Sequence, residues 1–235
     1  MSRARGVALV VAAAVLVTAP WWGPRALRPL RFFGVRRVEV VGARYLAPEA
    51  IAGALGLGER ASIFEDLRLL ERRVGALGGG GIAGVHVARR LPGTLRVEVR
   101  EVEPVALAEG PAGLVAVGGD GHPLPYDVTA TPVDAPLLAR IDGPLVRVLA
   151  TIQATDLGLY AEISAARSRG GEVVLELNEG RVLLAPPMDA GVVRSVSAVR
   201  RDLAARSLPW LELDARYRGW VIVRRRAGQV GGGAA

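Results

Sequence analysis

The feature that most constrains this chain is an uncharged apolar stretch close to its N-terminus. Residues 6–22, GVALVVAAAVLVTAPWW, hold no charged side chain and end in two tryptophans. As a helix this stretch would be about 25 Å long at ~1.5 Å per residue, slightly shorter than the ~30 Å hydrocarbon core of a bilayer. Tryptophan is enriched where a helix leaves that core. The sequence therefore predicts a transmembrane helix over 6–22 and a short cytoplasmic tail over 1–5.

A cleaved signal peptide is the alternative for this stretch. The apolar run has a suitable length, and Val17-Thr18-Ala19 resembles a cleavage site. Pro20 would directly follow the cut, and a proline there blocks processing, so we favour a retained anchor.

The membrane orientation of this anchor stays open. Arg3 and Arg5 precede the stretch, whereas five arginines follow it by residue 37. Counted alone, these charges place the C-terminal side in the cytoplasm, but the rule weakens when a large domain follows.

The composition of the chain is that of a folded protein without thiol chemistry. Hydrophobic residues make up 51% of the 235, which excludes wholesale disorder. No cysteine is present, which excludes disulfides, thiolate nucleophiles and cysteine-bound metals. All 30 basic residues are arginine and the net charge is +7, but the arginines are scattered among few aromatics, unlike a nucleic-acid platform. A basic chain also suits an anionic lipid surface.

Residues 35–103 have the patterns of a small α+β domain, preceded by a predicted linker over 23–34. Residues 35–41 alternate between apolar and polar, which predicts a half-buried strand. Residues 48–55 begin with proline, which suits the first turn of a short helix. Ser62-Ile63-Phe64-Glu65 matches a capping box for a second helix. The apolar residues on one face of that helix are Leu67, Leu70, Val74 and Leu77.

Two strands complete this predicted domain. Residues 85–89 and 94–102 alternate on either side of Leu91-Pro92-Gly93, and a Pro-Gly pair between such runs predicts a hairpin. The order strand, helix, helix, strand, strand requires both helices to pack on one face of a three-stranded sheet.

Residues 104–226 predict a β-rich domain with an antiparallel sheet and one long helix. Residues 173–177 and 181–185 flank Asn178-Glu179-Gly180, which predicts a hairpin loop with Gly180 in a left-handed conformation. The other predicted elements are helices over 144–154 and 189–205, strands over 211–217 and 220–224, and a disordered Gly/Ala tail over 227–235.

No set of residues predicts catalysis. Residues 79–84 fit the dinucleotide fingerprint, but they follow a helix and open a strand, the reverse of the context that phosphate binding needs. His86 and His122 are 36 positions apart and have no metal-ligand spacing around them. Glu101 and Glu103 are expected to be neighbours on an exposed strand face. The sequence thus predicts no catalytic, cofactor-binding or metal-binding residue.

Both predicted domains resemble one known family. The segments VRRVEVVGARYLAPEAI (35–51) and VHVARRLPGTLRVEVREVEPVALAE (85–109), in this order of elements, resemble the POTRA domain of the FtsQ/DivIB family of bacterial cell-division proteins. The second part resembles the FtsQ β-domain, whose terminal Asp-Leu-Arg-Tyr strand is nearly matched by the segment Leu213–Tyr217.

This resemblance implies a non-enzymatic scaffold of the divisome at the septum. Such a protein is anchored in the inner membrane by a single pass, exposes its domains to the periplasm and binds FtsB and FtsL. Strand addition to the open edge at 220–224 is the expected mode. The partner-binding residues implied by the resemblance are Arg216, Tyr217 and Trp220, together with Val221 and Val223 of the last strand.

Other interpretations stay open from the sequence. Tyr217 and Trp220 could fill the core of the β-rich domain instead of binding a partner. The chain could be a POTRA-containing envelope or outer-membrane assembly protein, although such chains continue into a long β-barrel. A membrane-anchored envelope enzyme is a further alternative, and the missing catalytic set speaks against it.

Overall fold

The chain divides into two compact units, with the boundary between Glu101 and Val102. Every helix of the described residues is too short or too polar to cross a bilayer. The predicted segments 1–5, 6–22 and 227–235 lie outside the described residues, apart from four positions of the apolar stretch. The computed structural model describes residues 7, 14, 17, 18, 31–77, 79–111 and 113–225.

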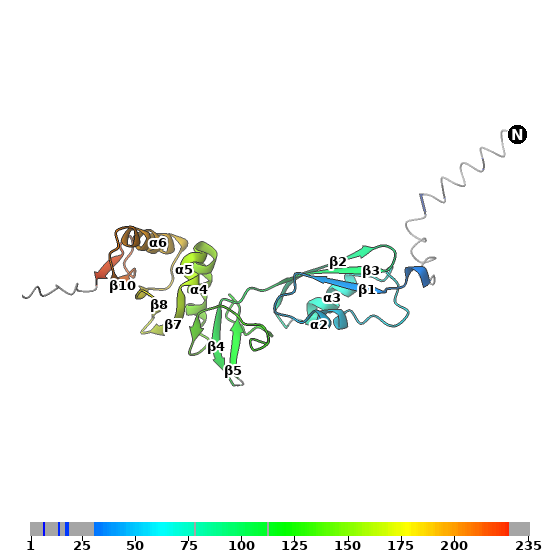
Figure 1. The fold of residues 1–235 in the computed structure, drawn as a ribbon, viewed down its shortest axis with the longest axis horizontal. Coiled ribbons are helices and arrows are strands. Elements are labelled where there is room, and N and C mark those ends of the chain that lie inside the picture. The colour runs from blue at the N-terminus through cyan, green and yellow to red at the C-terminus, as the bar shows by residue number, and fades with distance from the viewer. Residues whose placement is uncertain are drawn as a thin grey trace, which may run out of the picture. The chain divides into compact units, whose positions relative to one another are not determined.

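The first unit is a three-stranded sheet covered by two helices, as its sequence predicted. The sheet has the order β1-β3-β2, with β1 parallel and β2 antiparallel to the central β3. Both helices lie on the same face of this sheet (Figure 1). The elements are η1 (Arg31–Phe33), β1 (Arg37–Val41), α2 (Pro48–Ala54), α3 (Leu67–Leu77), β2 (Ile82–Arg90) and β3 (Thr94–Glu101).

The core of the first unit forms where the apolar stripe of each helix meets the sheet. Ile51 of α2 and Leu70 and Val74 of α3 are fully buried, as the spacing of apolar residues in α3 predicted. They pack in one cluster with Leu95 and Val97 of the central strand. Burying side chains of this size stabilises the fold by roughly 1.5–3 kcal/mol each.

The start of α3 differs from the prediction. Asp66 caps the helix, because its Oδ1 accepts from the N–H groups of Arg68 and Leu69 at 3.0 and 3.4 Å. Ser62 is buried four residues earlier, where its hydroxyl accepts from Phe64 N–H and donates to the Phe33 carbonyl. The predicted capping box was therefore wrong, since Ser62 ties the chain to the segment before β1.

The end of the predicted linker 23–34 belongs to the fold. Phe33 packs on the ring of Phe64 at a centroid distance of 5.2 Å and joins the core cluster. Val35 N–H donates to the Ala61 carbonyl at 2.8 Å. The packed part of the first unit therefore includes residues that precede β1.

Glu101 has a role that its place in an alternating strand did not reveal. Its carboxylate accepts from three consecutive backbone N–H groups, those of Arg44, Tyr45 and Leu46, at 2.8–2.9 Å. These donors belong to the loop between β1 and α2, and their partner lies more than fifty positions away along the chain. Glu101 is thus a structural residue of the loop rather than one of an exposed pair.

The outer edge of β2 is partly occupied by a side chain of α3. Glu71 Oε1 accepts from Val87 N–H at 2.9 Å and lies 3.4 Å from His86 Nδ1. Unpaired N–H groups of an edge strand are the groups to which another strand attaches. Glu71 takes up one of them.

The second unit is built on a sheet of eight strands in the order β11-β10-β9-β8-β7-β6-β4-β5. Helices α4, α5 and α6 pack against it (Figure 1). The elements are β4 (Ala106–Gly110), β5 (Gly113–Val117), β6 (Leu137–Leu138), α4 (Gly143–Thr155), α5 (Leu157–Ala161), β7 (Ile163–Arg169), β8 (Glu172–Leu177), β9 (Arg181–Leu184), α6 (Ala190–Ala205), β10 (Trp210–Asp214) and β11 (Ile222–Arg225).

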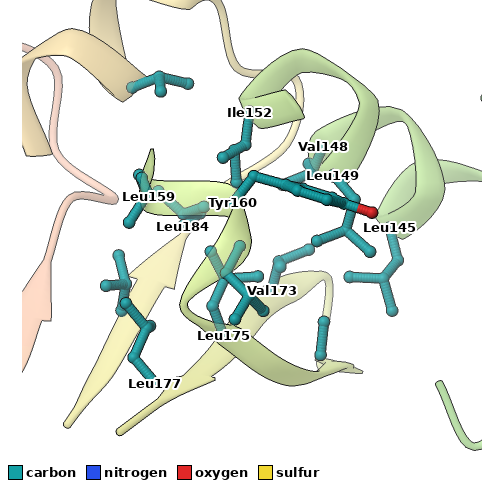
Figure 2. Packing of buried hydrophobic residues seen from close by; sticks show 14 of the residues in the cluster. Leu145, Val148, Leu149, Ile152, Leu159, Tyr160, Val173, Leu175, Leu177 and Leu184 are labelled. Carbon is teal, nitrogen blue, oxygen red and sulfur yellow. The ribbon is translucent and has the colours of Figure 1, made fainter. Parts of the chain in front are cut away.

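The core of the second unit lies between the helices and the central strands. Leu149 and Ile152 of α4 and Tyr160 of α5 point toward Val173 and Leu175 of β8 (Figure 2). The Tyr160 hydroxyl, buried in this apolar layer, donates to the Val105 carbonyl at 3.0 Å. The ring thus contributes apolar area while its one polar atom is satisfied.

Two predictions for the second unit need correction. The sheet is mixed rather than antiparallel, because α6 returns the chain from β9 to a parallel neighbour, β10. Parallel neighbours need a long crossover connection, which is usually a helix. The predicted strand 211–217 ends at Asp214, where the Asp214 and Arg216 side chains bond to each other and turn the chain.

Gly180 is required for a reason other than the predicted left-handed backbone. It is not among the residues with positive φ. A Cβ at this position would lie 2.6 Å from the Leu211 carbonyl oxygen and 2.9 Å from the Trp210 ring. The hairpin loop needs glycine because β10 passes so close to it.

Candidate functional site at the C-terminal sheet edge

The strand β11 lies at one end of the eight-stranded sheet. It pairs with β10 in antiparallel register, Leu213 opposite Val223 and Asp214 opposite Ile222. No further strand of the described residues pairs with its other side. The predicted last strand over 220–224 is therefore an edge strand over 222–225.

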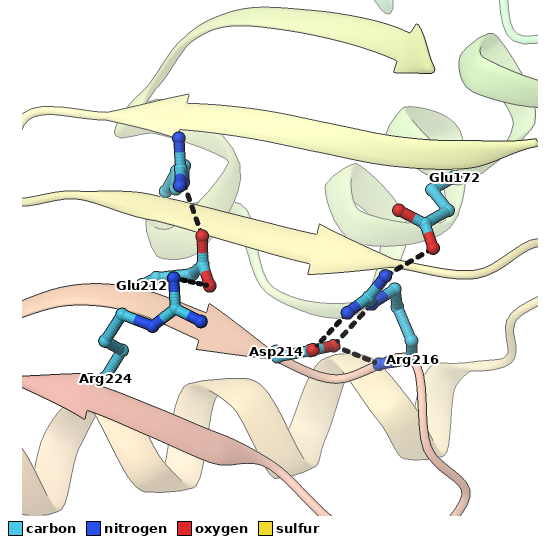
Figure 3. Close-up of polar contacts among 6 residues, drawn as sticks. Glu172, Glu212, Asp214, Arg216 and Arg224 are labelled. Carbon is cyan, nitrogen blue, oxygen red and sulfur yellow. Dashed lines mark hydrogen bonds and ion pairs between the residues drawn. The ribbon is translucent and has the colours of Figure 1, made fainter. Parts of the chain in front are cut away.

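Arg216 follows β10 and joins two strands (Figure 3). Its Nε and Nη2 donate to Oδ1 and Oδ2 of Asp214 at 2.8 and 2.6 Å, a two-point contact that fixes the guanidinium plane. Its Nη1 donates to Glu172 at the start of β8. The guanidinium thus reaches past β9 and fastens the chain after β10 to the sheet.

These contacts shift the titration of both partners. The hydrogen bonds from Arg216 hold the pKa of Asp214 below its usual range. In return, the hydrogen bonds to Asp214 and Glu172 raise the pKa of Arg216. Both groups are charged at neutral pH and form an ion pair, so Arg216 has a structural role in the chain that follows β10.

A second ion-pair set lies on the same face of the sheet. Glu212 of β10 is buried and contacts Arg181 of β9 at 2.6 Å and Arg224 of β11 at 3.3 Å (Figure 3). The three residues share one cross-strand row, with opposite charges on neighbouring strands. Arg224 is the outermost of the three, and this row helps hold β11 in register.

Tyr217 and Trp220 lie in the turn between β10 and β11 and face solvent. Tyr217 is 54% exposed and Trp220 is 75% exposed. The turn is closed by a hydrogen bond from Trp220 N–H to the Tyr217 carbonyl at 3.1 Å, with Gly219 at φ +78°. The possibility that these two rings fill the core is therefore wrong.

The two valines of the implied site are placed differently from the rings. Val221 and Val223 are half-buried and pack against the core of the second unit. Ile222 between them is 54% exposed. The resemblance did not single out Ile222, but the alternation of side chains along a strand could have identified it as the outward residue.

The described residues contain no group of three or more His, Asp or Glu side chains that could hold a metal ion. His86 and His122 each lie beside a single carboxylate, at 3.4 Å from Glu71 and 3.2 Å from Asp120. The glycine-rich residues 79–84 run into the start of β2, whereas a phosphate loop runs into the N-terminus of a helix.

The first unit, with its two helices on one face of a β1-β3-β2 sheet, has the architecture of a POTRA domain. Residues 33–101 match the family described as POTRA domain, FtsQ-type. The match covers the first unit and identifies it as a POTRA domain of the FtsQ type, the type of domain for which a part in cell division is suggested. No curated protein matches the chain.

Proposed function

We propose that this protein is a membrane-anchored scaffold of the bacterial divisome that recruits FtsB and FtsL at the septum through periplasmic domains. The observation that carries the proposal is the FtsQ-type POTRA domain over 33–101. The uncharged stretch 6–22 is its proposed single-pass anchor in the inner membrane, and the proposed domain bounds are 35–103 and 104–226. The FtsQ-type match favours this role over outer-membrane assembly.

The proposed recruitment mode is addition of a partner strand to β11. An edge strand offers N–H and C=O groups that a partner strand can pair with, and the row of charges that includes Arg224 holds this edge in register. Within a strand pair, alternate side chains then give specificity. Ile222 supplies an outward apolar contact next to the pairing edge.

Tyr217 and Trp220 are the proposed anchors of that contact. Large aromatic rings dominate the free energy of many protein interfaces, and two such rings lie exposed in this one turn. Arg216 has a different proposed task. Because Asp214 and Glu172 hold it, it positions the turn that presents the two rings.

A binding experiment with FtsB tests this site. The double variant Tyr217→Ala and Trp220→Ala should weaken the affinity of the full chain for FtsB by on the order of a thousandfold, since two hot-spot rings at about 2 kcal/mol each contribute about 4 kcal/mol. The matched control is Leu114→Ala with Leu157→Ala, which removes two exposed apolar side chains elsewhere in the same unit. Equal capture by both variants, with unchanged circular dichroism, would rule out the turn as the binding site.

A second experiment tests the proposed location. A reporter enzyme that is active only in the periplasm is fused after residue 225, and the same fusion is made to a chain without residues 1–22. Activity in the first fusion and not in the second is the expected result. Activity of a cytoplasmic reporter instead would place the domains on the other side, as the arginine count alone suggests.

A further inference from the structure

The first unit carries two exposed apolar side chains at one of its ends. Phe32 of η1 is 60% exposed, and Leu91 in the turn between β2 and β3 is 69% exposed. Neither belongs to the core cluster of the unit. Side chains of this size at the surface of a small domain mark a contact when they gather together.

Backbone contacts bring these two side chains to the same end of the domain. Arg36 and Arg37 donate their N–H groups to the Gly93 carbonyl at 2.8 and 3.3 Å, so the turn that holds Leu91 abuts the start of β1. Arg36 Nη2 donates to the Phe32 carbonyl at 3.1 Å. In Figure 1, η1 and the turn between β2 and β3 lie at the same end of the sheet.

Three arginines lie at the same end of the first unit. Arg37 and Arg90 both pair with Thr94 across the sheet, so they share one row on the face that the helices leave uncovered. The Arg36 guanidinium lies 6.0 Å from the centre of the Phe32 ring. Among the described residues, the only carboxylate in an ion pair with these three arginines is Glu39, 3.9 Å from Arg90. One end of the first unit, called here the Phe32–Leu91 surface, thus carries two exposed apolar side chains together with three arginines.

The sequence before this surface has the same character. No acidic residue precedes Glu39, whereas seven arginines do. Only eight residues separate Trp22, the end of the uncharged stretch, from Arg31. Even fully extended, the ten peptide steps from Trp22 to Phe32 cover roughly 35 Å at ~3.3–3.6 Å each. If residues 6–22 cross the membrane, Phe32 stays within that distance of the lipid headgroups.

We propose that the Phe32–Leu91 surface rests on the membrane, with Phe32 and Leu91 inserted at the headgroup level and Arg36, Arg37 and Arg90 bound to anionic lipid phosphates. The inference rests on the membrane anchor of the proposed function and is independent of FtsB and FtsL. Apolar side chains combined with arginines are the combination that binds anionic lipid surfaces. The contact orients the first unit relative to the bilayer.

The absence of cysteine allows a direct test in the full chain. The variant Leu91→Cys takes a bimane label, and the protein is reconstituted into vesicles of phosphatidylcholine with about one third phosphatidylglycerol, a typical anionic composition. Brominated acyl chains in these vesicles quench a label that reaches them. We expect a blue shift and strong quenching at position 91. The matched control is Leu157→Cys in the second unit, which is 66% exposed and should not be quenched.

The basic residues are tested in the labelled protein. Replacing Arg36, Arg37 and Arg90 by glutamate should abolish quenching at position 91. The same change at Arg140, Arg169 and Arg194, exposed arginines of the second unit, alters the net charge equally and should leave quenching intact. Vesicles of phosphatidylcholine alone should quench the label less than anionic vesicles do.

Flotation of the vesicles in a density gradient tests the membrane anchor separately from the proposed lipid contact of the first unit. A chain that floats with the vesicles but shows equal, weak quenching at positions 91 and 157 keeps its anchor and overturns the lipid contact. A chain that does not float overturns both. Quenching at position 91 that persists in the triple glutamate variant refutes the role of the arginines.

Discussion

Arg216 contacts carboxylates on two different strands, and this decides what its removal does. Arg216→Ala leaves Asp214, which is largely buried, without its cationic partner. A buried carboxylate without a partner is costly. We therefore expect the midpoint of urea unfolding to fall. Arg218→Ala, two positions on and exposed, is the control and should leave the midpoint unchanged; equal midpoints for the two variants would contradict this role.

The depressed pKa of Asp214 predicts how the stability of the second unit depends on pH. The unfolded carboxyl takes up its proton near pH 4, at a higher pH than the folded one. Its contribution to the free energy of unfolding is therefore complete above pH 4 and is lost as the pH falls through the lower folded pKa. The free energies of unfolding in urea of the native chain and of Asp214→Asn should differ most near pH 7 and become equal in acid.

At the residue scale, sequence reasoning missed contacts whose partners are distant along the chain. The FtsQ/DivIB resemblance implies Arg216, Tyr217 and Trp220 as one site, but it did not reveal the contact from Arg216 to Glu172, which spans 44 positions. Glu101 was missed for the same reason, since its backbone partners lie in another loop. Alternation along a strand shows which face a residue occupies, but not which loop folds over it.

At the scale of elements, the start of α3 allows the observed Asp66 cap to be compared with the predicted capping box. Asp66→Ala removes the side-chain acceptor for two helix N–H groups and should destabilise the first unit by about 1 kcal/mol. Glu65→Ala keeps the backbone carbonyl that Arg89 contacts and should change stability by much less. Chemical denaturation of both variants decides between the observed cap and the capping box; a larger loss in Glu65→Ala would favour the box.

The loop between β8 and β9 gives a second comparison. Gly180→Ala forces a Cβ against the Leu211 carbonyl and the Trp210 ring and should destabilise the second unit by about 1–3 kcal/mol. Gly75 lies inside α3 with open space around it. Gly75→Ala should raise the stability of the first unit by roughly 0.5–1 kcal/mol, because alanine favours the helix. Thermal unfolding measures both, and a tolerated Gly180→Ala would mean that β10 can move away.

Helices and strands with regular apolar spacing, or with clear capping and turn residues at their ends, were predicted from the sequence. Helices α4 and α6 follow their apolar spacing, and Asp142 and Asp189 cap them. The strand β7, with the sequence ISAARSR, was missed because it has little apolar alternation. It forms because β8 supplies a buried apolar neighbour. The parallel pairing of β9 with β10 depends on how α6 packs, which no local pattern encodes.

At the scale of the whole molecule, the two units should respond separately to substitution. Each has its own apolar core, and the boundary falls between consecutive residues. Domains with separate cores unfold with separate transitions unless a large interface couples them. In calorimetry we expect Asp66→Ala to lower one transition and Gly180→Ala to lower the other, with additive effects in the double variant. A single transition that shifts with either substitution would show strong coupling.

The Glu71 carboxylate on the edge of β2 affects how copies of the protein can associate with one another. β2 is nine residues long, and a strand of that length with an open edge could align with its counterpart in another copy. Glu71 covers the Val87 N–H that such alignment uses and adds a negative charge there. One side chain thereby disfavours edge-to-edge pairing between folded copies of the domain.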